Sequence, residues 1–360
     1  MTKEELNRLI IDAPDRKVEQ TIRAGWDGIA KPLDSLGRFE AITARIGAIT
    51  GSTKIDISSK AVIVMCADNG IVEEGISQCG QEVTAMVAES MARGTSCVCK
   101  MAKAIGADVI PVDIGINKEM DADGIVDRKI SYGTRNFLKE PAMTEEETLR
   151  AITTGMEMAA VCKRQGYGIL ATGEMGIGNT TTAGAVAAAL LECRAEEIAG
   201  RGAGLSEEGL LRKYEVINGA LSKYQFKKTD ALGILSAVGG LDIAGLAGVF
   251  IGGARFHIPI VVDGAISAVA ALTAQRLVPG VKEYMIPSHV SREPAAKKIM
   301  EELGISPVID AKMALGEGTG AVMMLSLLDI ALSLYENQTR FQDIRVGQYV
   351  RFQQGEGERW

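Results

Sequence analysis

The sequence predicts an α/β fold, because two patterns alternate along the chain. Short apolar runs that end in polar residues are typical of buried parallel strands that lead into loops. Stretches of helical periodicity separate these runs. This alternation implies right-handed crossovers between strands, with helices on both faces. We therefore expect a doubly wound, mainly parallel sheet of the Rossmann-like kind.

Each expected strand is a compact run with a polar carboxyl end. The runs are "KAVIVMCADNG" from Lys60, "ADVIPVDIG" (107–115), "YGILATGEMG" (167–176), "HIPIVVDG" (257–264) and "EYMIPSH" (283–289). Helical patterns occupy the segments 79–104, 144–165, 180–191, 207–224 and 229–252. The Thr-x-x-Glu spacing of "TEEE" at 144–147 predicts a capping box at the start of one helix. The first fifty residues also have helical patterns, which Pro32 interrupts.

The composition excludes several classes of protein. Of the 360 residues, 47% are hydrophobic and 24% are charged, which is typical of a globular chain with a substantial core. The net charge of −7 argues against a nucleic-acid or anionic-membrane partner. The six cysteines form no CxxC pair, so reduced thiols are expected. The N-terminus lacks a signal-peptide pattern, and Asp329 interrupts the apolar stretch 319–335; we expect a soluble, cytoplasmic protein.

Polar residues gather at one edge of the predicted sheet. In open α/β sheets the ligand lies beyond the carboxyl ends of the strands. The residues at these ends are Asp68–Asn69, Asp113, Glu174, Asp263 and Ser288–His289. The pattern therefore predicts the place of the site before its chemistry is considered.

The most specific motif is "GEMGIGNTTTAGAV" at 173–186. Its glycines let the backbone approach a ligand closely, and "NTTT" begins a helix with hydroxyls and free N–H groups, which favours an anion site. The alternative is a tight turn with a helix cap, although such a turn needs fewer glycines. The motif has neither a Walker lysine nor the spacing of a dinucleotide fingerprint, which argues against a kinase or a dehydrogenase.

Four other motifs have competing interpretations. Asp263 either caps the helix that follows it or contacts a ribose hydroxyl. The loop "PSHVSREP" (287–294) suits phosphate or ribose contacts better than a Ser–His hydrolase, because no G-x-S-x-G elbow is present. The small residues of "GGLDIAGLAGVFIGGA" (239–254) favour close helix packing over a dinucleotide loop. From the residues alone, the pair "RK" at 212–213 is expected on a solvated helix face.

An acid stands where a phosphate loop would not need one. Glu317 lies between Gly316 and Gly318 in "ALGEGTGAVMM" (314–324), just before an apolar helix pattern. Glycine-rich turns before helices usually offer N–H groups to an anion, which a carboxylate would repel. The motif therefore favours a role for Glu317 other than phosphate binding.

Together these stretches closely resemble the nicotinate-nucleotide–dimethylbenzimidazole phosphoribosyltransferase family. The matching pieces appear in family order from about residue 30 to residue 335. They are "KPLDSLGRFE", "CADNGI", "QEVTAMV", "GEMGIGNTTTAGAV", "GGLDIAG", "VVDGAISAVAAL", "SHVSREP" and "LGEGTGAVMMLSLLDIA". Two pieces, "GEMGIGNTTTA" and "LGEGTGA", are highly specific. Asn69 and Arg292 depart from the family pattern, which leaves the identity of the acceptor base open.

The resemblance implies an architecture and a reaction. It implies a large α/β catalytic domain (51–329), a small helical domain made of both chain ends (1–50 with 330–360), and a homodimer. The reaction moves phosphoribose from nicotinate mononucleotide to 5,6-dimethylbenzimidazole, giving α-ribazole 5′-phosphate and nicotinate. A phenolic or purine acceptor and a non-catalytic nucleotide-binding protein are the alternatives. No cofactor is implied, and two distant histidines argue against a zinc site.

The resemblance also assigns residues. Glu317 matches the catalytic base, and Glu174 to Asn179 would line the pocket for base and nucleotide. Independently of the resemblance, positive charge at the reacting carbon would favour a nearby carboxylate, either Glu174 or Asp263. Lys213 and Ser291 would lie toward the phosphate, and Gln81 beside the aromatic base. The remaining expected substrate-binding residues are Met175, Gly176, Gly178, Asn179, Thr180, Asp263, Gly264 and Leu315.

The expected chemistry needs only one proton acceptor. The pyridinium leaving group departs as neutral nicotinate nitrogen, so the general acid of a glycosidase is not required. The acceptor benzimidazole loses its N–H proton as its other ring nitrogen attacks C1′, and one carboxylate can take that proton. Attack opposite the leaving group inverts C1′, which gives an α product from a β nucleotide.

Overall fold

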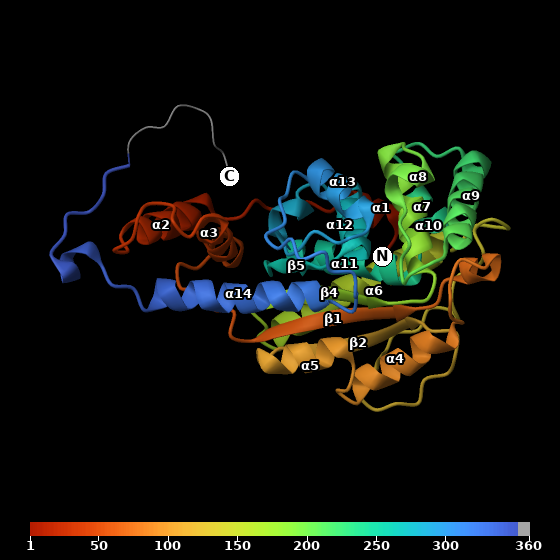
Figure 1. The fold of residues 1–360 in the computed structure, drawn as a ribbon, viewed down its shortest axis with the longest axis horizontal. Helices are drawn as coiled ribbons and strands as arrows, with labels where there is room; N and C mark the ends of the chain where they lie inside the picture. The colour runs from red at the N-terminus through yellow and green to blue at the C-terminus, as the bar shows by residue number, and fades with distance from the viewer. Residues whose placement is uncertain (352–360) are drawn as a thin grey trace.

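The computed structural model of the protein describes residues 1–351, and its centre is a six-stranded parallel sheet (Figure 1). All five expected strands are present, and a two-residue edge strand joins them. The strands are β1 (Lys60–Ala67), β2 (Asp108–Gly115), β3 (Val126–Asp127), β4 (Ile169–Met175), β5 (Ile260–Val262) and β6 (Met285–Pro287). Every pairing between neighbouring strands is parallel, which confirms the predicted class of sheet.

The strand order places a switch point between β1 and β4. The order across the sheet is β3-β2-β1-β4-β5-β6, so the chain winds outward in both directions from this pair. Met65 of β1 lies opposite Glu174 of β4 in the parallel register. Ligands of doubly wound sheets bind outside the carboxyl ends of the strands at such a point. Glu174 therefore lies where the topology favours a site.

Helices flank the sheet on both faces. Those before β4 are α1 (Lys3–Asn7), α2 (Arg16–Asp27), α3 (Arg38–Thr50), α4 (Glu82–Ala92), α5 (Cys97–Ala104) and α6 (Glu145–Arg164). Those after β4 are α7 (Asn179–Leu191), α8 (Ala195–Ile198), α9 (Glu207–Tyr224), α10 (Ala231–Val238), α11 (Leu241–Arg255), α12 (Ala265–Leu277), α13 (Pro294–Leu303) and α14 (Thr319–Glu336). Three short 3₁₀ helices complete the regular structure, η1 (Gly70–Glu74), η2 (Val281–Tyr284) and η3 (Phe341–Ile344).

Small residues allow close packing on one face of the sheet. Helices α11 and α12 cover this face, with α6 packed on α11, whereas α4, α5 and α14 contact the other face. A Cβ atom on Gly155 of α6 would lie 1.9 Å from the carbonyl oxygen of Gly245, and one on Gly248 would lie 2.0 Å from that of Ile152. No side chain fits at that distance, so the interpretation of residues 239–254 as a packing helix is confirmed. The capping box of Thr144 and Glu147 is confirmed as well.

Two expected helices are each divided in two. The expected helix 79–104 is two helices, α4 and α5, with a turn between them. In this turn Gly94 has a φ of +70°, and Ser96 caps the start of α5. The stretch 229–252 is broken at Gly239 and Gly240, whose backbones are extended. The second break brings the N-terminus of α11 to the carboxyl edge of the sheet, which the periodicity alone did not predict.

Helices from the first fifty residues lie beside the last described part of the chain at one end of the molecule (Figure 1). Helices α2 and α3 lie beside the C-terminal half of α14 and the residues after it (Figure 1). The rings of Trp26 and Tyr335 are 4.9 Å apart, and the Trp26 indole N–H donates to Thr43 at 2.9 Å. Helix α1 lies elsewhere, where Lys3 pairs with Glu145 of α6. The division into 1–50 with 330–360 and 51–329 stays a prediction, and residues 352–360 lie outside the described chain.

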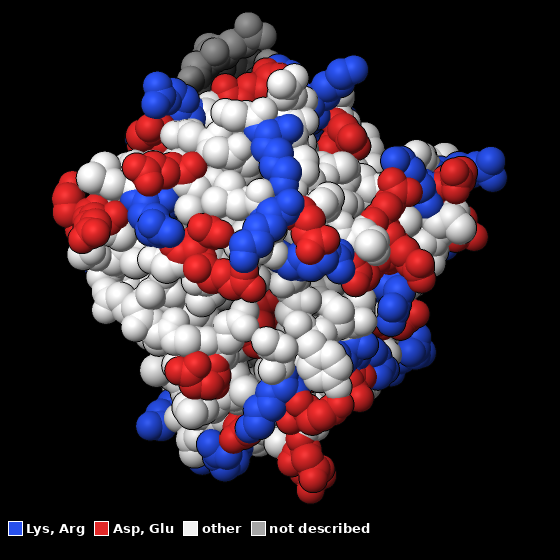
Figure 2. All heavy atoms as spheres, turned by 90° about the vertical axis from the view of Figure 1, so that its right-hand side faces the viewer, with Lys and Arg blue, Asp and Glu red and all other residues white. Residues whose placement is uncertain are grey.

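The surface charges of both signs are mixed, and one long helix is apolar. On the face in Figure 2, basic and acidic side chains are interspersed over a largely uncharged surface. Within residues 1–351, α14 is the helix long and apolar enough to cross a membrane by length and composition, and 50% of its apolar window is buried. A core helix of a globular protein has the same composition.

Candidate active site

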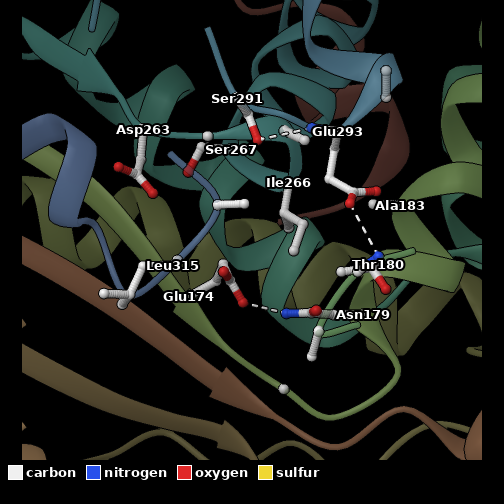
Figure 3. Close-up of a pocket in the computed structure, with 18 of the residues that line it drawn as sticks. Glu174, Asn179, Thr180, Ala183, Asp263, Ile266, Ser267, Ser291, Glu293 and Leu315 are labelled. Carbon is white, nitrogen blue, oxygen red and sulfur yellow. Dashed lines mark hydrogen bonds between the residues drawn. The ribbon is translucent and has the colours of Figure 1, made fainter. Parts of the chain in front are cut away.

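A cavity of about 250 Å³ opens at the carboxyl ends of β4, β5 and β6, beside the switch point. It brings together residues from five separate stretches of the sequence, several of which are visible in Figure 3. Most of the expected site residues line it: Glu174, Met175, Gly176, Asn179, Thr180, Asp263, Gly264, Ser291, Leu315 and Glu317. Its wall also includes apolar atoms of Ile177, Ala183, Ile198 and Ile266.

Three expected site residues lie outside this cavity wall. Gln81 lines a separate hollow, where its Nε2 donates to the Asn69 carbonyl at 3.2 Å and its Oε1 accepts from Asn117 at 3.1 Å. Gly178 is the turn residue before α7, with a φ of +91° that suits glycine. Lys213 lies behind Thr180. Gly178 and Lys213 thus lie directly beside cavity residues, whereas Gln81 does not line this cavity.

Glu174 lies on the cavity floor, at the end of β4. Its carboxylate accepts a hydrogen bond from the side-chain amide of Asn179, the first residue of α7 (Figure 3). Burial raises the pKa of Glu174 to about 8, and the nearby carboxylates of Asp242, Asp263 and Glu317 add to the rise. Charge repulsion and desolvation both favour the neutral acid. In the free protein at neutral pH, Glu174 is therefore mostly protonated.

Asp263 anchors the start of a helix distant in sequence. Its Oδ1 accepts the backbone N–H of Ala321 in the first turn of α14 at 2.9 Å, so it caps α14 rather than the α12 helix that follows it. Burial raises the pKa of Asp263, while His289 and the N–H groups of Gly264 and Gly320 oppose the rise. Because Asp263 also lines the cavity, the ribose contact stays open as a second role.

The Glu317 loop has an unusual backbone. Gly316, Glu317 and Gly318 have φ values of +86°, +61° and +92°, so three successive residues are left-handed. Glu317 tolerates this region less well than glycine, and such local strain is common at functional sites. The loop lies directly on β4, since a Cβ on Gly173 would be 2.5 Å from the Glu317 carbonyl oxygen. Its carboxylate Oε2 accepts the N–H of Val98 at 3.1 Å.

A buried lysine lies behind the cavity wall at Thr180. Lys213 of α9 is 0% exposed, and its Nζ donates to Thr180 Oγ1 and to the Gly200 carbonyl, both at 2.9 Å. Burial lowers the pKa of Lys213 to about 8, against the attraction of Glu293. The expectation of a solvated face is thus wrong for Lys213, although its neighbour Arg212 is exposed. The helix pattern could not reveal that α9 turns Lys213 inward.

Glu293 is a cavity residue that the sequence interpretation missed. Its Oε1 accepts the N–H of Gly202 at 3.0 Å, and its own N–H donates to Ser291 Oγ at 3.3 Å (Figure 3). The two residues that depart from the family pattern do not line the cavity. Asn69 is buried beneath the 176–178 turn, and Arg292 is exposed. Only the position of Glu293 in the loop 287–294 hinted at its role.

In the described part of the chain, the one group of acidic side chains close enough together to hold a metal ion lies away from the cavity. The carboxylates of Asp27, Asp34 and Glu40 lie close enough together to share an ion. Arg351 pairs with the first two, each at 2.7 Å, and Lys31 pairs with Glu40 at 2.6 Å. These cations already neutralise the cluster.

The fold and the cavity together define an α/β protein with a switch-point site, in which carboxyl groups lie opposite a helix N-terminus and a buried lysine. The comparisons with known proteins agree. A family model described as phosphoribosyltransferase matches residues 11–346, and the chain belongs to this family.

Named relatives are similar over nearly the whole chain. A nicotinate-nucleotide–dimethylbenzimidazole phosphoribosyltransferase from Acetivibrio thermocellus is 47% identical over 323 residues, which cover 90% of this chain and 92% of the relative. One from Clostridium acetobutylicum is 42% identical over 339 residues, covering 94% and 96%. The crystal structure of CobT from Thermus thermophilus superposes with a TM-score of 0.87 at 37% identity, covering 92% of this chain and all of that one (100%).

Proposed function

We propose that the protein transfers phosphoribose from nicotinate mononucleotide to 5,6-dimethylbenzimidazole or a related base. The products are nicotinate and the α-riboside 5′-phosphate of the base. The activity for which the relatives are named supports this reaction. The observation that carries it in this chain is Glu317, a carboxylate held on a strained loop at the wall of the cavity.

Release of nicotinate from the nucleotide needs stabilisation of positive charge more than it needs a general acid. The C1′–N bond to the pyridinium breaks, and its electron pair stays on the ring nitrogen. Positive charge then develops at C1′, which nearby carboxylates stabilise. Glu174 and Asp263 line the cavity and serve this purpose in our proposal. Because Glu174 is mostly protonated in the free protein, we expect the cationic donor to favour loss of its proton.

The acceptor end needs one base. One ring nitrogen of the benzimidazole forms the new bond to C1′, and the proton of its other nitrogen passes to Glu317. Oε2 of Glu317 is held by the Val98 N–H, which leaves Oε1 to take the proton. General base catalysis of this kind contributes about 10²–10⁴-fold.

The phosphate belongs at the opposite end of the cavity. The N-terminus of α7 offers N–H groups and the Thr180 hydroxyl, and Lys213 supplies positive charge directly behind that hydroxyl. Ser291 lines the cavity near Ser267 and connects through Glu293 to the Gly202 N–H (Figure 3). The positions of Thr180 and Lys213 support their assigned phosphate roles. Gln81 lines a separate hollow, so its role beside the base rests on the resemblance alone.

We also propose a homodimer that works in the cytoplasm. Met323, Ile330 and Leu334 are exposed on α14 at spacings that share one face, and a second copy would cover this apolar stripe. The same helix begins at the Glu317 loop, which would bring the partner close to the cavity. The six cysteines are all free, which suits a reducing compartment.

A competition experiment tests the reaction and the acceptor together. The purified protein is incubated with nicotinate mononucleotide and equal amounts of dimethylbenzimidazole, benzimidazole, adenine and phenol. Mass spectrometry identifies the products, and NMR of the sugar gives the anomer. We expect α-linked riboside phosphate and nicotinate in equal amounts. Nucleotide binding without transfer to any base would instead identify a non-catalytic nucleotide-binding protein.

A further inference from the structure

Beneath the cavity floor lies a carboxylate that the proposed mechanism does not use. Asp242, in the first turn of α11, is 0% exposed. Its Oδ1 accepts the N–H of Ile243 at 2.9 Å. Among the described residues, its Oδ2 has no hydrogen-bond partner of good geometry, and the side-chain amides of Asn69 and Asn179 are the polar groups facing this carboxylate. A buried carboxylate without its full set of hydrogen bonds lowers the stability of the fold, so its presence needs an explanation.

The loop that carries the site residues lies directly on this carboxylate. A Cβ on Gly176 would be 2.9 Å from Asp242 Oδ2 and 3.1 Å from Asn69 Nδ2. A Cβ on Gly240, just before α11, would be 2.3 Å from Asp242 Oδ1. The turn after β4 and the start of α11 therefore fit together only with glycine at both places. This packing fixes the distance between the turn after β4 and the Asp242 carboxylate.

Asn179 connects the buried carboxylate of Asp242 with the carboxylate of Glu174, which lines the cavity. Its Nδ2 carries two N–H donors, and one of them reaches Glu174. Asp242 lies on the other side of this amide, which helps to stabilise the Asp242 charge. The carboxylates of Glu174 and Asp242 each favour an N–H group of the Asn179 amide and repel its oxygen. The amide is thereby held with its nitrogen, and not its oxygen, toward Glu174.

We propose that Asp242 is a positioning residue that acts on Glu174 through the side-chain amide of Asn179. It holds the amide nitrogen toward Glu174. Its own negative charge, behind the amide, opposes ionisation of Glu174, whereas the amide N–H favours the carboxylate. The inference rests on the proposed function for the purpose of Glu174, but the Glu174 titration that tests it does not. Asp242 touches no substrate in this account.

The charged groups around the pair agree with this assignment. Burial raises the pKa of Asp242 to about 6, whereas hydrogen bonds from Ile243, Asn179 and Asn69 oppose the rise. Asp242 is also the strongest charge among those that raise the pKa of Glu174; the others are Asp263 and Glu317. Cys66 of β1 faces both acids with its thiol protonated, because burial raises its pKa, and His289 faces Asp263. At neutral pH Asp242 and Glu174 therefore hold about one proton between them, and it lies on Glu174.

The direct test follows the titration of Glu174 itself. The protein is labelled with ¹³C at the glutamate carboxyl groups, and Glu174→Gln identifies the Glu174 resonance. Asp242→Asn and Asp242→Ser remove the charge, and the serine retains an acceptor for the first turn of α11. We expect either variant to lower the titration midpoint of Glu174 by about one pH unit. A midpoint that stays within about 0.2 pH units of wild type would overturn the proposal. Asp230→Asn, at the N-cap of α10, is the matched control and should leave it unchanged.

A kinetic cycle tests the route through Asn179. If Asp242 acts through this amide, Asp242→Asn and Asn179→Ala should each lower kcat about tenfold, and the double variant should fall no further. Multiplying effects would show that Asp242 acts independently of Asn179 and would overturn the proposed route. An inactive wild-type protein would contradict the proposed function alone, since the Glu174 titration still decides the role of Asp242.

Discussion

The backbone N–H of Val98 donates a hydrogen bond to Glu317 Oε2 at 3.1 Å, across 219 positions of sequence. Val98 lies in the first turn of α5, so Glu317 satisfies one of the free N–H groups at a helix N-terminus. The proposed catalytic base is therefore also a structural link between the loop before α14 and the helix that follows α4. Its orientation does not depend on a bound substrate.

This link predicts different stabilities for two substitutions of Glu317. Glu317→Ala removes the acceptor at the start of α5 and should lower the free energy of unfolding by about 0.5–2 kcal/mol. Glu317→Gln keeps an acceptor oxygen and should lose less. Urea unfolding followed by circular dichroism measures both. Equal stability of the alanine variant and wild type would mean that the Val98 contact contributes nothing.

The raised pKa of Glu174 predicts a pH-dependent cost to stability. An ordinary glutamate titrates near 4.5, and folded Glu174 has its pKa raised to about 8. Between these values the unfolded chain has released a proton that the folded chain still holds, so the free energy of unfolding falls as pH rises. Glu174→Gln removes this loss. Relative to wild type, it should gain stability from about pH 5 to pH 8, on the order of a few kcal/mol at most.

The control for this prediction is Glu157→Gln on the exposed face of α6. Its stability difference from wild type should stay constant over the same pH range. Thermal or urea unfolding at several pH values between about 5 and 8 gives both curves. A constant difference for Glu174→Gln as well would show that Glu174 titrates in the ordinary range.

The buried position of Lys213 predicts a phosphate-specific loss of affinity. Lys213→Met keeps the apolar stem but removes the charge behind Thr180, and a charged hydrogen bond is worth about 1.5–3 kcal/mol. Calorimetry should therefore give about 10–100-fold weaker binding of nicotinate mononucleotide, with little change for nicotinate riboside, which lacks the phosphate. Arg212→Met, on the exposed side of the same helix, should change neither. Equal losses for both ligands would remove Lys213 from the phosphate site.

The apolar stripe on α14 predicts the site of self-association. Ile330 is 65% exposed, and Ile330→Asp would place a charge in the middle of the stripe formed with Met323 and Leu334. Sedimentation should then shift from dimer to monomer while circular dichroism stays unchanged. Ile10→Asp, another exposed isoleucine at a distant place in the sequence, is the control. A variant that remains a dimer would place the interface elsewhere.

Local patterns predicted the fold well because its elements depend on local chemistry. The buried run at Lys60–Ala67 and the Thr144–Glu147 capping box are both decided within a few residues. The two-residue strand Val126–Asp127 carries too few residues for any periodicity, so it was missed. The breaks before α5 and α11 were also missed, because glycines and Ser96 interrupt otherwise continuous helical patterns.

The site was predictable in its motifs but not in its long-range contacts. The polar ends of β4 and β5 placed Glu174 and Asp263 correctly at one edge of the sheet. Nothing local indicates that Asp263 caps α14, that Asn69 is buried beneath the 176–178 turn, or that Lys213 is fully buried. These features depend on how distant helices pack, which a single sequence does not specify.

In our proposal Glu317 takes the acceptor proton, and the turnover rate of Glu317→Gln decides whether it does. The glutamine keeps the shape of the loop and an acceptor for Val98, but it cannot take up a proton at neutral pH. With nicotinate mononucleotide and dimethylbenzimidazole as substrates, we predict that kcat falls about 10²–10⁴-fold while the Kd for the nucleotide changes less than about twofold. Turnover at the wild-type rate would contradict the account.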